Sequence, residues 1–175
     1  MNIYLIGFMG SGKSSSGRKI ASSFHWNFVD IDELVEEEKG VSVADLFAKE
    51  GEHCFRMAER DALLTVSQKS RTVVACGGGT PCSEENMNLM KSTGVTVYLK
   101  LPVDALASRL RKSRTVRPLI HGVAAADIEV IITELLEKRA EWYEQADLII
   151  DGLNTPEEEV TSLIAGLVRS RGAFL

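Results

Sequence analysis

Short apolar runs alternate along the whole chain with segments in which apolar residues recur at the spacing of a helix. The apolar runs predict five strands, at residues 3–6, 27–30, 72–76, 95–99 and 147–151. Helices are expected at residues 17–24, 33–39, 42–48, 52–68, 102–111 and 127–143, with a last helix after Pro156. Strands that alternate with helices favour a parallel sheet between two helical layers. The pattern therefore predicts an α/β fold of three layers, α/β/α, around a five-stranded parallel sheet.

Residues with capping preferences mark two helix boundaries. Ser42 followed by Asp45 resembles a capping box with Asp in place of Glu, and we expect it to open the helix at residues 42–48. Near the carboxyl terminus, Thr155 is expected as the N-cap of the last helix and Pro156 as its first residue.

A glycine-rich segment, Gly-Phe-Met-Gly-Ser-Gly-Lys-Ser at residues 7–14, lies between the first predicted strand and the first predicted helix. Glycines let the backbone fold around an anion with its N–H groups pointing inward, and the helix adds the positive end of its dipole. Lys13 is expected to reach the β- and γ-phosphates of a nucleoside triphosphate, and the Ser14 hydroxyl to ligate Mg²⁺. An ordinary Gly/Ser turn is the alternative, and the flanking strand and helix argue against it. The ATP-binding residues that the motif predicts are Gly10, Ser11, Gly12, Lys13 and Ser14, and the family resemblance described below adds Ser15.

The composition is that of a soluble globular protein, with 45% hydrophobic and 26% charged residues. A length of 175 residues suits one well-buried core, so we expect a single domain over residues 1–175. No apolar run approaches the length of a membrane span, and the apolar start lacks the basic leader of a signal peptide. The three cysteines, Cys54, Cys76 and Cys82, form no C-x-x-C pair, which fits a reducing cytoplasm.

Five basic residues gather between Arg109 and Arg117, although the net charge of the chain is −5. The net charge argues against nucleic acid as a partner of the surface as a whole. The local cluster suggests a bound polyanion, which the predicted phosphate loop supplies. A solvated basic helix end is the alternative, and it suits Lys112 and Arg114 best. Because a proline and a glycine follow before the next helix, we expect a mobile flap here.

Two carboxylates that could serve phosphate chemistry, Asp30 and Asp32, follow the second predicted strand. In an extended strand end their side chains point to the same side, about 6–7 Å apart. Asp30 is expected to face Mg²⁺ through water, and Asp32 to face the hydroxyl that accepts the phosphoryl group. An unperturbed carboxylate cannot deprotonate an alcohol in the ground state, so Asp32 is expected to accept the proton late in the transfer. The alternative for either residue is a cap on the helix near Glu33, and both roles can hold.

Three consecutive glycines, Gly77, Gly78 and Gly79, follow the third predicted strand. One glycine suffices for a turn, whereas three allow the backbone to approach a ligand closely at the edge of the sheet where ligands bind. A plain loop is the alternative. We therefore expect this run to contribute to a substrate site.

Six motifs follow one another along nearly the whole chain. They are residues 7–14, Asp30-x-Asp32, Gly51-Glu52 followed by Phe55-Arg56, Gly77-Gly78-Gly79, Arg117-Pro118-Leu119, and Lys138-Arg139 with Tyr143. Apart from the phosphate loop each motif is weak alone, but six in order at compatible spacing are strong, and together they resemble the shikimate kinase family. The resemblance implies a fold of the P-loop kinase type with a mobile lid over about residues 112–125. It also implies a shikimate-binding helical segment over residues 31–62.

The resemblance further implies Mg²⁺-dependent transfer of the ATP γ-phosphate to the 3-hydroxyl of shikimate. The products are shikimate 3-phosphate and ADP, on the route to chorismate and the aromatic amino acids.

The catalytic residues that the resemblance implies are Lys13, Asp32 and Arg117, and its substrate-binding residues are Asp32, Arg56, Gly77, Gly78, Gly79 and Arg139. Arg56 and Arg139 match the arginines that hold the shikimate carboxylate, and Arg117 matches the lid arginine on the phosphates. Adenine is expected near Pro156 and against Arg109, with Arg111 as the alternative. The resemblance implies a monomer whose partners are ATP and shikimate, and no nucleic acid or membrane partner is expected.

Other functions stay open at this point. Another small-molecule kinase of the same architecture, such as a gluconate or nucleotide kinase, would lack the glycine run combined with Arg56 and Arg139. A regulatory protein that has lost catalysis would lack Lys13, Asp32 or Arg117, and all three are present. A GTPase is disfavoured because the guanine-reading pattern Asn-Lys-x-Asp is absent. For either binding arginine, the alternative is a surface ion pair with a glutamate at helical spacing.

Overall fold

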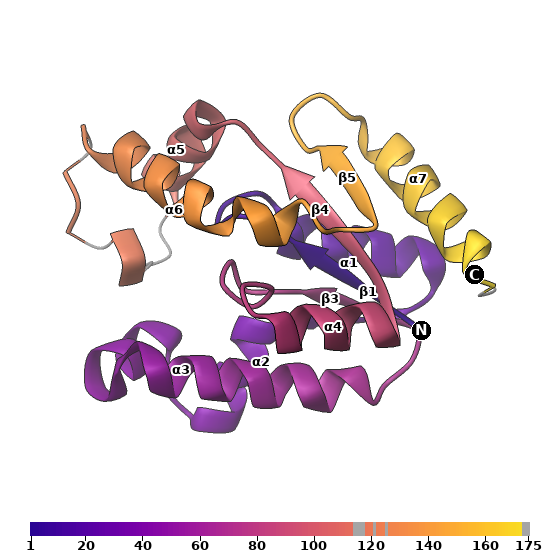
Figure 1. The fold of residues 1–175 in the computed structure, drawn as a ribbon, viewed down its shortest axis with the longest axis horizontal. Helices are drawn as coiled ribbons and strands as arrows, with labels where there is room; N and C mark the ends of the chain where they lie inside the picture. Colours follow the sequence, from indigo (N-terminus) through magenta and orange to yellow (C-terminus); the bar gives the residue numbers. More distant parts are fainter. Residues whose placement is uncertain (114–117, 121, 125, 173–175) are drawn as a thin grey trace.

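Five parallel strands form one sheet in the spatial order β2-β3-β1-β4-β5 (Figure 1). The structure is a computed structural model that describes residues 1–113, 118–120, 122–124 and 126–172. The strands are β1 (Asn2–Ile6), β2 (Asn27–Asp30), β3 (Thr72–Ala75), β4 (Gly94–Lys100) and β5 (Leu148–Asp151). Each predicted strand is present within one residue of its predicted ends, so the prediction of a five-stranded parallel sheet is confirmed.

Helices cover both faces of this sheet (Figure 1). They are α1 (Lys13–Phe24), α2 (Ile31–Lys39), α3 (Val43–Ser67), α4 (Glu84–Thr93), α5 (Val103–Lys112), α6 (Ile128–Tyr143) and α7 (Glu157–Ser170), with a 3₁₀ turn, η1 (Pro118–Ile120). Over the part of the chain that the structure describes, no helix is both long and apolar enough to cross a bilayer.

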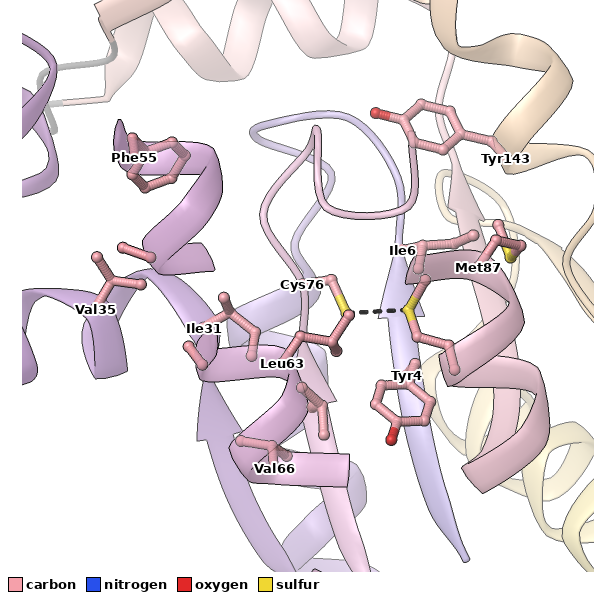
Figure 2. Close-up of a cluster of buried hydrophobic side chains, with 14 of the residues drawn as sticks. Tyr4, Ile6, Ile31, Val35, Phe55, Leu63, Val66, Cys76, Met87 and Tyr143 are labelled. Atoms are coloured by element: carbon pink, nitrogen blue, oxygen red, sulfur yellow. Dashed lines mark hydrogen bonds between the residues drawn. The ribbon is translucent and has the colours of Figure 1, made fainter. Parts of the chain in front are cut away.

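Alternation along β1 divides the core between the two faces of the sheet. Tyr4 and Ile6 pack with α2, α3 and α4, whereas Ile3 and Leu5 pack with α1 and α7. All four side chains are fully buried. Figure 2 shows the first of these clusters, with Tyr4 and Ile6 facing the helices. A third cluster joins Phe8 of the phosphate loop to α5 and α6, so the loop is anchored in the core.

Two helices begin earlier than predicted. α1 begins at Lys13 rather than at residue 17, because Gly12, with a φ of 99°, turns the phosphate loop directly into the first helical turn. α2 begins at Ile31 rather than at Glu33, because Asp30 is its N-cap and accepts a hydrogen bond of 3.0 Å from the backbone N–H of Asp32. Asp32 therefore lies in the first turn of a helix, and the prediction that it extends the strand is wrong.

The predicted break between two helices is present inside α3, at Gly51, whose φ of 84° and ψ of 172° are not helical. The N-cap that opens α3 is also confirmed at Ser42, although Asp45 answers through the Ser42 hydroxyl instead of the backbone N–H of a full capping box. The backbone N–H of Asp45 donates to Ser42 Oγ at 3.1 Å, and Ser42 Oγ donates to Asp45 Oδ2 at 2.7 Å. α7, in contrast, has Pro156 as its N-cap, so the prediction of Thr155 at that position is wrong. Thr155 belongs to the preceding turn, where its N–H donates to the Asp151 carbonyl at 3.0 Å.

α4 is the one element that the apolar pattern missed among the described helices. Only Met87 and Met90 of its residues are buried, which is too few to produce a helical period. A local signal was nevertheless present, because Ser83 is the N-cap and its Oγ accepts a hydrogen bond of 3.2 Å from the N–H of Asn86.

Candidate active site

The candidate site lies at the carboxyl ends of β1, β2 and β3. Because these strands are parallel neighbours, the segments that follow them meet at one edge of the sheet. Two adjoining cavities open there, with volumes of about 600 Å³ and about 180 Å³. Both cavities are lined by Met9, Ser14, Asp30, Asp32, Gly77 and Gly78. The larger one extends over α2 and α3, and the smaller one over the phosphate loop, so the two cavities share a wall and form one continuous site.

The phosphate loop has the backbone that its glycines predict. Gly7, Gly10 and Gly12 have φ values of 137°, 80° and 99°, a region that residues with a side chain rarely adopt. The Lys13 side chain is buried and folds back across the loop, where Nζ donates to the carbonyls of Gly7 at 2.9 Å and Phe8 at 2.8 Å. Lys13 is also one of the residues that line the smaller cavity, where its cation suits anionic phosphate groups.

Asp30 connects the phosphate loop to α2. Its Oδ2 accepts a hydrogen bond of 2.5 Å from Ser14 Oγ, and its Oδ1 accepts the N–H of Asp32 at the start of α2. A serine hydroxyl beside a carboxylate is a pair of hard oxygen donors, which suits Mg²⁺. Over the described residues no cluster of three or more His, Cys, Asp or Glu side chains could hold a metal ion by itself. The pair fits Mg²⁺ all the same, because this ion usually takes one or two protein groups and completes its shell with phosphates and water.

Asp32 faces both cavities from the first turn of α2. It lies close to the glycine run, since a Cβ built on Gly77 would be 3.0 Å from Asp32 Oδ1. The two predicted carboxylates therefore share one site, although a helix rather than an extended strand end brings Asp32 there.

Arg56 projects from the second half of α3 into the larger cavity. Its guanidinium pairs with Glu52 at 2.9 Å and with Glu59 at 2.8 Å. The ion-pair and substrate-binding interpretations of Arg56 are thus compatible, because the residue forms the helical ion pairs and still lines the cavity. Burial by itself would lower the pKa of the guanidinium, but the two carboxylates outweigh burial and raise that pKa.

Glu59 is a site residue that the sequence reasoning missed, except as a candidate ion-pair partner. Its side chain is 1% exposed, and its other oxygen accepts a hydrogen bond of 2.5 Å from Thr80 Oγ1. Glu59 therefore ties Arg56 to the loop that follows β3. The helical spacing of Arg56 and Glu59 was the only sequence signal, and it could not distinguish a surface pair from a buried one.

The three glycines after β3 leave room for these charged side chains. A Cβ on Gly77 would lie 2.2 Å from Glu59 Oε1, and a Cβ on Gly79 would lie 2.4 Å from Arg56 Nη1. A Cβ on Gly78 would lie 3.1 Å from Arg139 Nη1. The run thus leaves space for the close approach of the site's own charged groups, with the tightest fits at Gly77 and Gly79.

Arg139 reaches the same cavity from α6. Its residue is 8% exposed, and its guanidinium carbon lies 5.7 Å from the centre of the Phe8 ring. This burial contradicts the alternative of a surface ion pair. Arg56 and Arg139, 83 residues apart in the chain (139 − 56), therefore line one cavity together.

The walls of the larger cavity include apolar side chains. Phe47 and Phe55, from the two halves of α3, lie with ring centres 4.7 Å apart, and Leu119 of η1 adds a third apolar side chain. A cavity with two arginines at one end and apolar walls suits a small cyclic carboxylate.

The two candidates for adenine contact lie in different surroundings on α5. Arg109 Nη1 donates to the carbonyl of Ser11 at 3.1 Å and so lies against the phosphate loop. Arg111 pairs with Glu129 of α6 at 2.9 Å. Pro156 caps α7 and is not among the residues that line either cavity. Arg117 lies outside the described residues, as do residues 114–116, 121 and 125 of the predicted lid at 112–125.

Known proteins resemble this chain over most of its length. A model of the family "Shikimate kinase" matches residues 9–168. A shikimate kinase of Thermodesulfovibrio yellowstonii is 41% identical, over 93% of this chain and 92% of that protein. The crystal structure of a shikimate kinase from Bacteroides thetaiotaomicron superposes with a TM-score of 0.88 at 35% identity, over 97% of this chain and 98% of that one. A shikimate kinase from Acinetobacter baumannii, solved in complex with shikimate, gives a TM-score of 0.88 at 30% identity, over 99% of this chain and 95% of that one. The chain therefore belongs to the shikimate kinase family.

Proposed function

We propose that this protein transfers the γ-phosphate of ATP to the 3-hydroxyl of shikimate, giving shikimate 3-phosphate and ADP. The observation that carries the proposal is the meeting of Arg56 and Arg139 with Asp32 in one cavity, directly beside the phosphate loop. The family membership supports it, as does the relative that was solved with shikimate bound. The reaction belongs to the route to chorismate and the aromatic amino acids.

On the donor side, the phosphate loop binds ATP through its backbone N–H groups. Lys13 exchanges its contacts with the Gly7 and Phe8 carbonyls for the β- and γ-phosphates, and so stabilises the negative charge that develops during transfer. Ser14 and, through water, Asp30 would hold Mg²⁺, which neutralises phosphate charge when bound. Arg117 from the lid adds a second cation to the phosphates, as the family resemblance implies.

On the acceptor side, Arg56 and Arg139 bind the carboxylate of shikimate. Two planar guanidiniums match a planar carboxylate, whereas lysine would not. Asp32 orients the acceptor hydroxyl and takes its proton late in the reaction, since a loose transition state needs little prior deprotonation. The Gly78 backbone adds a contact to the bound ring, with Gly77 and Gly79 on either side. The lid at 112–125 closes over both ligands and excludes water.

The nucleotide base is held by Arg109 rather than Arg111, because Arg109 donates to the Ser11 carbonyl of the phosphate loop, whereas Arg111 pairs with Glu129 of α6. Pro156 contributes to the adenine site from the β5–α7 turn. We further propose that the protein acts as a cytoplasmic monomer on ATP and shikimate, without a nucleic acid or membrane partner. We also propose that residues 1–175 form a single domain, in which residues 31–62 are the shikimate-binding segment.

The proposal is tested by measuring ADP release with ATP and Mg²⁺ present. Shikimate is compared as acceptor with gluconate, with a nucleoside monophosphate and with no acceptor. We expect turnover above the blank with shikimate alone. Rates with shikimate that equal the blank would falsify the acceptor assignment, and turnover with another acceptor would identify a different small-molecule kinase.

A further inference from the structure

α6 presents two side chains to the glycine run, one helical turn apart. Arg139 and Tyr143, the last residue of the helix, are four residues apart and so project from the same face. Both are buried, and Tyr143 is 0% exposed. In Figure 2 the Tyr143 side chain extends from α6 with its hydroxyl directed toward the loop that follows β3.

Both side chains lie beside Gly78. The Tyr143 hydroxyl donates a hydrogen bond of 2.5 Å to the Gly78 carbonyl. Arg139 Nη1 lies close enough that a Cβ on Gly78 would be 3.1 Å from it. Arg139 lines the larger cavity, whereas Tyr143 lies behind it with its ring packed on Tyr98, 5.0 Å between ring centres. Tyr143 thus contacts the wall of the acceptor cavity from the outside.

We infer that Tyr143 is a positioning residue for the acceptor: by binding the Gly78 carbonyl it fixes the glycine run relative to Arg139, and so sets the affinity for shikimate. This inference rests on the proposed function. It assigns to the site a residue that touches neither substrate and that acts through Gly78.

The Gly78 carbonyl accepts from two side chains. Gly78 has no Cβ, so local sterics leave several peptide orientations open. The hydrogen bond from the buried Tyr143 hydroxyl selects one of them, and the Cys82 thiol makes a longer contact of 3.8 Å with the same carbonyl. The donor is permanent, because burial raises the pKa of the Tyr143 phenol, an effect that the nearby Arg139 guanidinium only partly opposes. The hydroxyl therefore keeps its proton at neutral pH.

The test compares Tyr143→Phe with Tyr4→Phe. Both variants remove the hydroxyl of a fully buried tyrosine, and the Tyr4 hydroxyl is paired with Thr93 Oγ1 at 2.7 Å on the amino-terminal side of β1, away from the cavities. Phe keeps the ring that packs on Tyr98, so both variants are expected to fold, with Tm reporting the lost hydrogen bond. Shikimate affinity is measured calorimetrically without nucleotide, and KM and kcat are measured for both substrates.

For Tyr143→Phe we expect the Kd and KM for shikimate to rise about threefold to tenfold, as for the loss of one hydrogen bond at a binding site. The KM for ATP should change by less than about twofold. For Tyr4→Phe we expect a lower Tm but an unchanged Kd for shikimate. An unchanged Kd in Tyr143→Phe, or an equal rise in Tyr4→Phe, overturns the inference alone. A wild-type protein that neither binds nor phosphorylates shikimate overturns the proposed function as well.

Discussion

Two carboxylates in this site, Asp30 and Glu59, each accept hydrogen bonds from two different groups. Asp30 accepts hydrogen bonds from Ser14, at the start of α1, and from the N–H of Asp32, in the first turn of α2. Glu59 does the same for Arg56 and Thr80. Because each carboxylate is fixed at both oxygens, the groups that would contact ATP and shikimate are held in place by the protein before any ligand binds.

The first residue prediction concerns Arg139, one of the two arginines proposed to bind the carboxylate of shikimate. Arg139→Ala should raise the KM for shikimate about tenfold or more, since charge-assisted bidentate bonds to the carboxylate are lost. Arg139→Lys should restore little of the affinity, and the KM for ATP should stay nearly unchanged. Steady-state kinetics check this, with Arg60→Ala as the control, because Arg60 forms an exposed ion pair with Glu85. An unchanged shikimate KM in Arg139→Ala would remove Arg139 from the site.

The second residue prediction separates the two arginines on α5. Arg109→Ala should raise the KM for ATP severalfold, because Arg109 lies against the phosphate loop. Arg111→Ala should leave the KM for ATP nearly unchanged, because this side chain pairs with Glu129 on the surface. The two variants share a helix and a charge change, so each is the control of the other. The reverse ranking of the two KM values would show that Arg111 holds the nucleotide.

At the scale of elements, the two halves of α3 on either side of the break at Gly51 both line the larger cavity. The first half brings Phe47 and the second half Phe55 and Arg56 to the cavity wall. Gly51, between them, has φ and ψ values that are essentially restricted to glycine. The element that carries the acceptor site therefore depends on one backbone conformation.

Gly51→Ala should accordingly lower the free energy of unfolding by about 1–3 kcal/mol, the cost of forcing a side chain into this region. Space is not the cause, because no atom lies within 4 Å of a Cβ built there. Gly166→Ala in α7 is the control, since it also meets no neighbour but lies in regular helix, and it should be neutral or stabilise by about 0.5–1 kcal/mol. Urea unfolding of both variants measures the difference, and equal stabilities would contradict the strain at Gly51.

At the scale of the whole molecule, the sheet buries several phenol groups. Burial raises the pKa of Tyr98 to about 12 and also raises the pKa of Tyr4 and Tyr143. In the unfolded chain a phenol ionises near a pKa of about 10. Above that pH the unfolded state binds fewer protons than the folded state, so the free energy of unfolding falls as pH rises.

We therefore expect stability to be constant with respect to these phenols below about pH 10, and to be lost between about pH 10 and 12. Urea unfolding at a series of alkaline pH values measures the loss. Tyr98→Phe should show a shallower decline over the same range, because one of the buried phenols is absent. Parallel pH profiles for this variant and the wild type would show that Tyr98 does not contribute.

Several features were predictable because their cause is local. The strands follow from short apolar runs, the N-cap of α3 from Ser42 and Asp45, and the phosphate loop from glycines between a strand and a helix. The family resemblance added the functional assignments of Arg56 and Arg139, which spacing alone did not distinguish from surface ion pairs. The structure brings both arginines to one cavity.

Other features depended on contacts between distant parts of the chain. α4 carries too few apolar residues for its period to be visible. The role of Glu59 depends on Thr80, the choice between Arg109 and Arg111 on where α5 lies over the phosphate loop, and the role of Tyr143 on its contact with Gly78.

The sequence by itself thus determined the order and type of most elements, the phosphate loop and the family, because these depend on residues that are neighbours along the chain. The tertiary structure decided which charged side chains share the acceptor cavity and what holds them there. The physical reason is that parallel strands bring together loops that are dozens of residues apart, such as those after β1 and β3. The spacing of Arg56 and Glu59 is that of an ordinary helical ion pair. The pair belongs to the site because Glu59 is buried at that edge of the sheet.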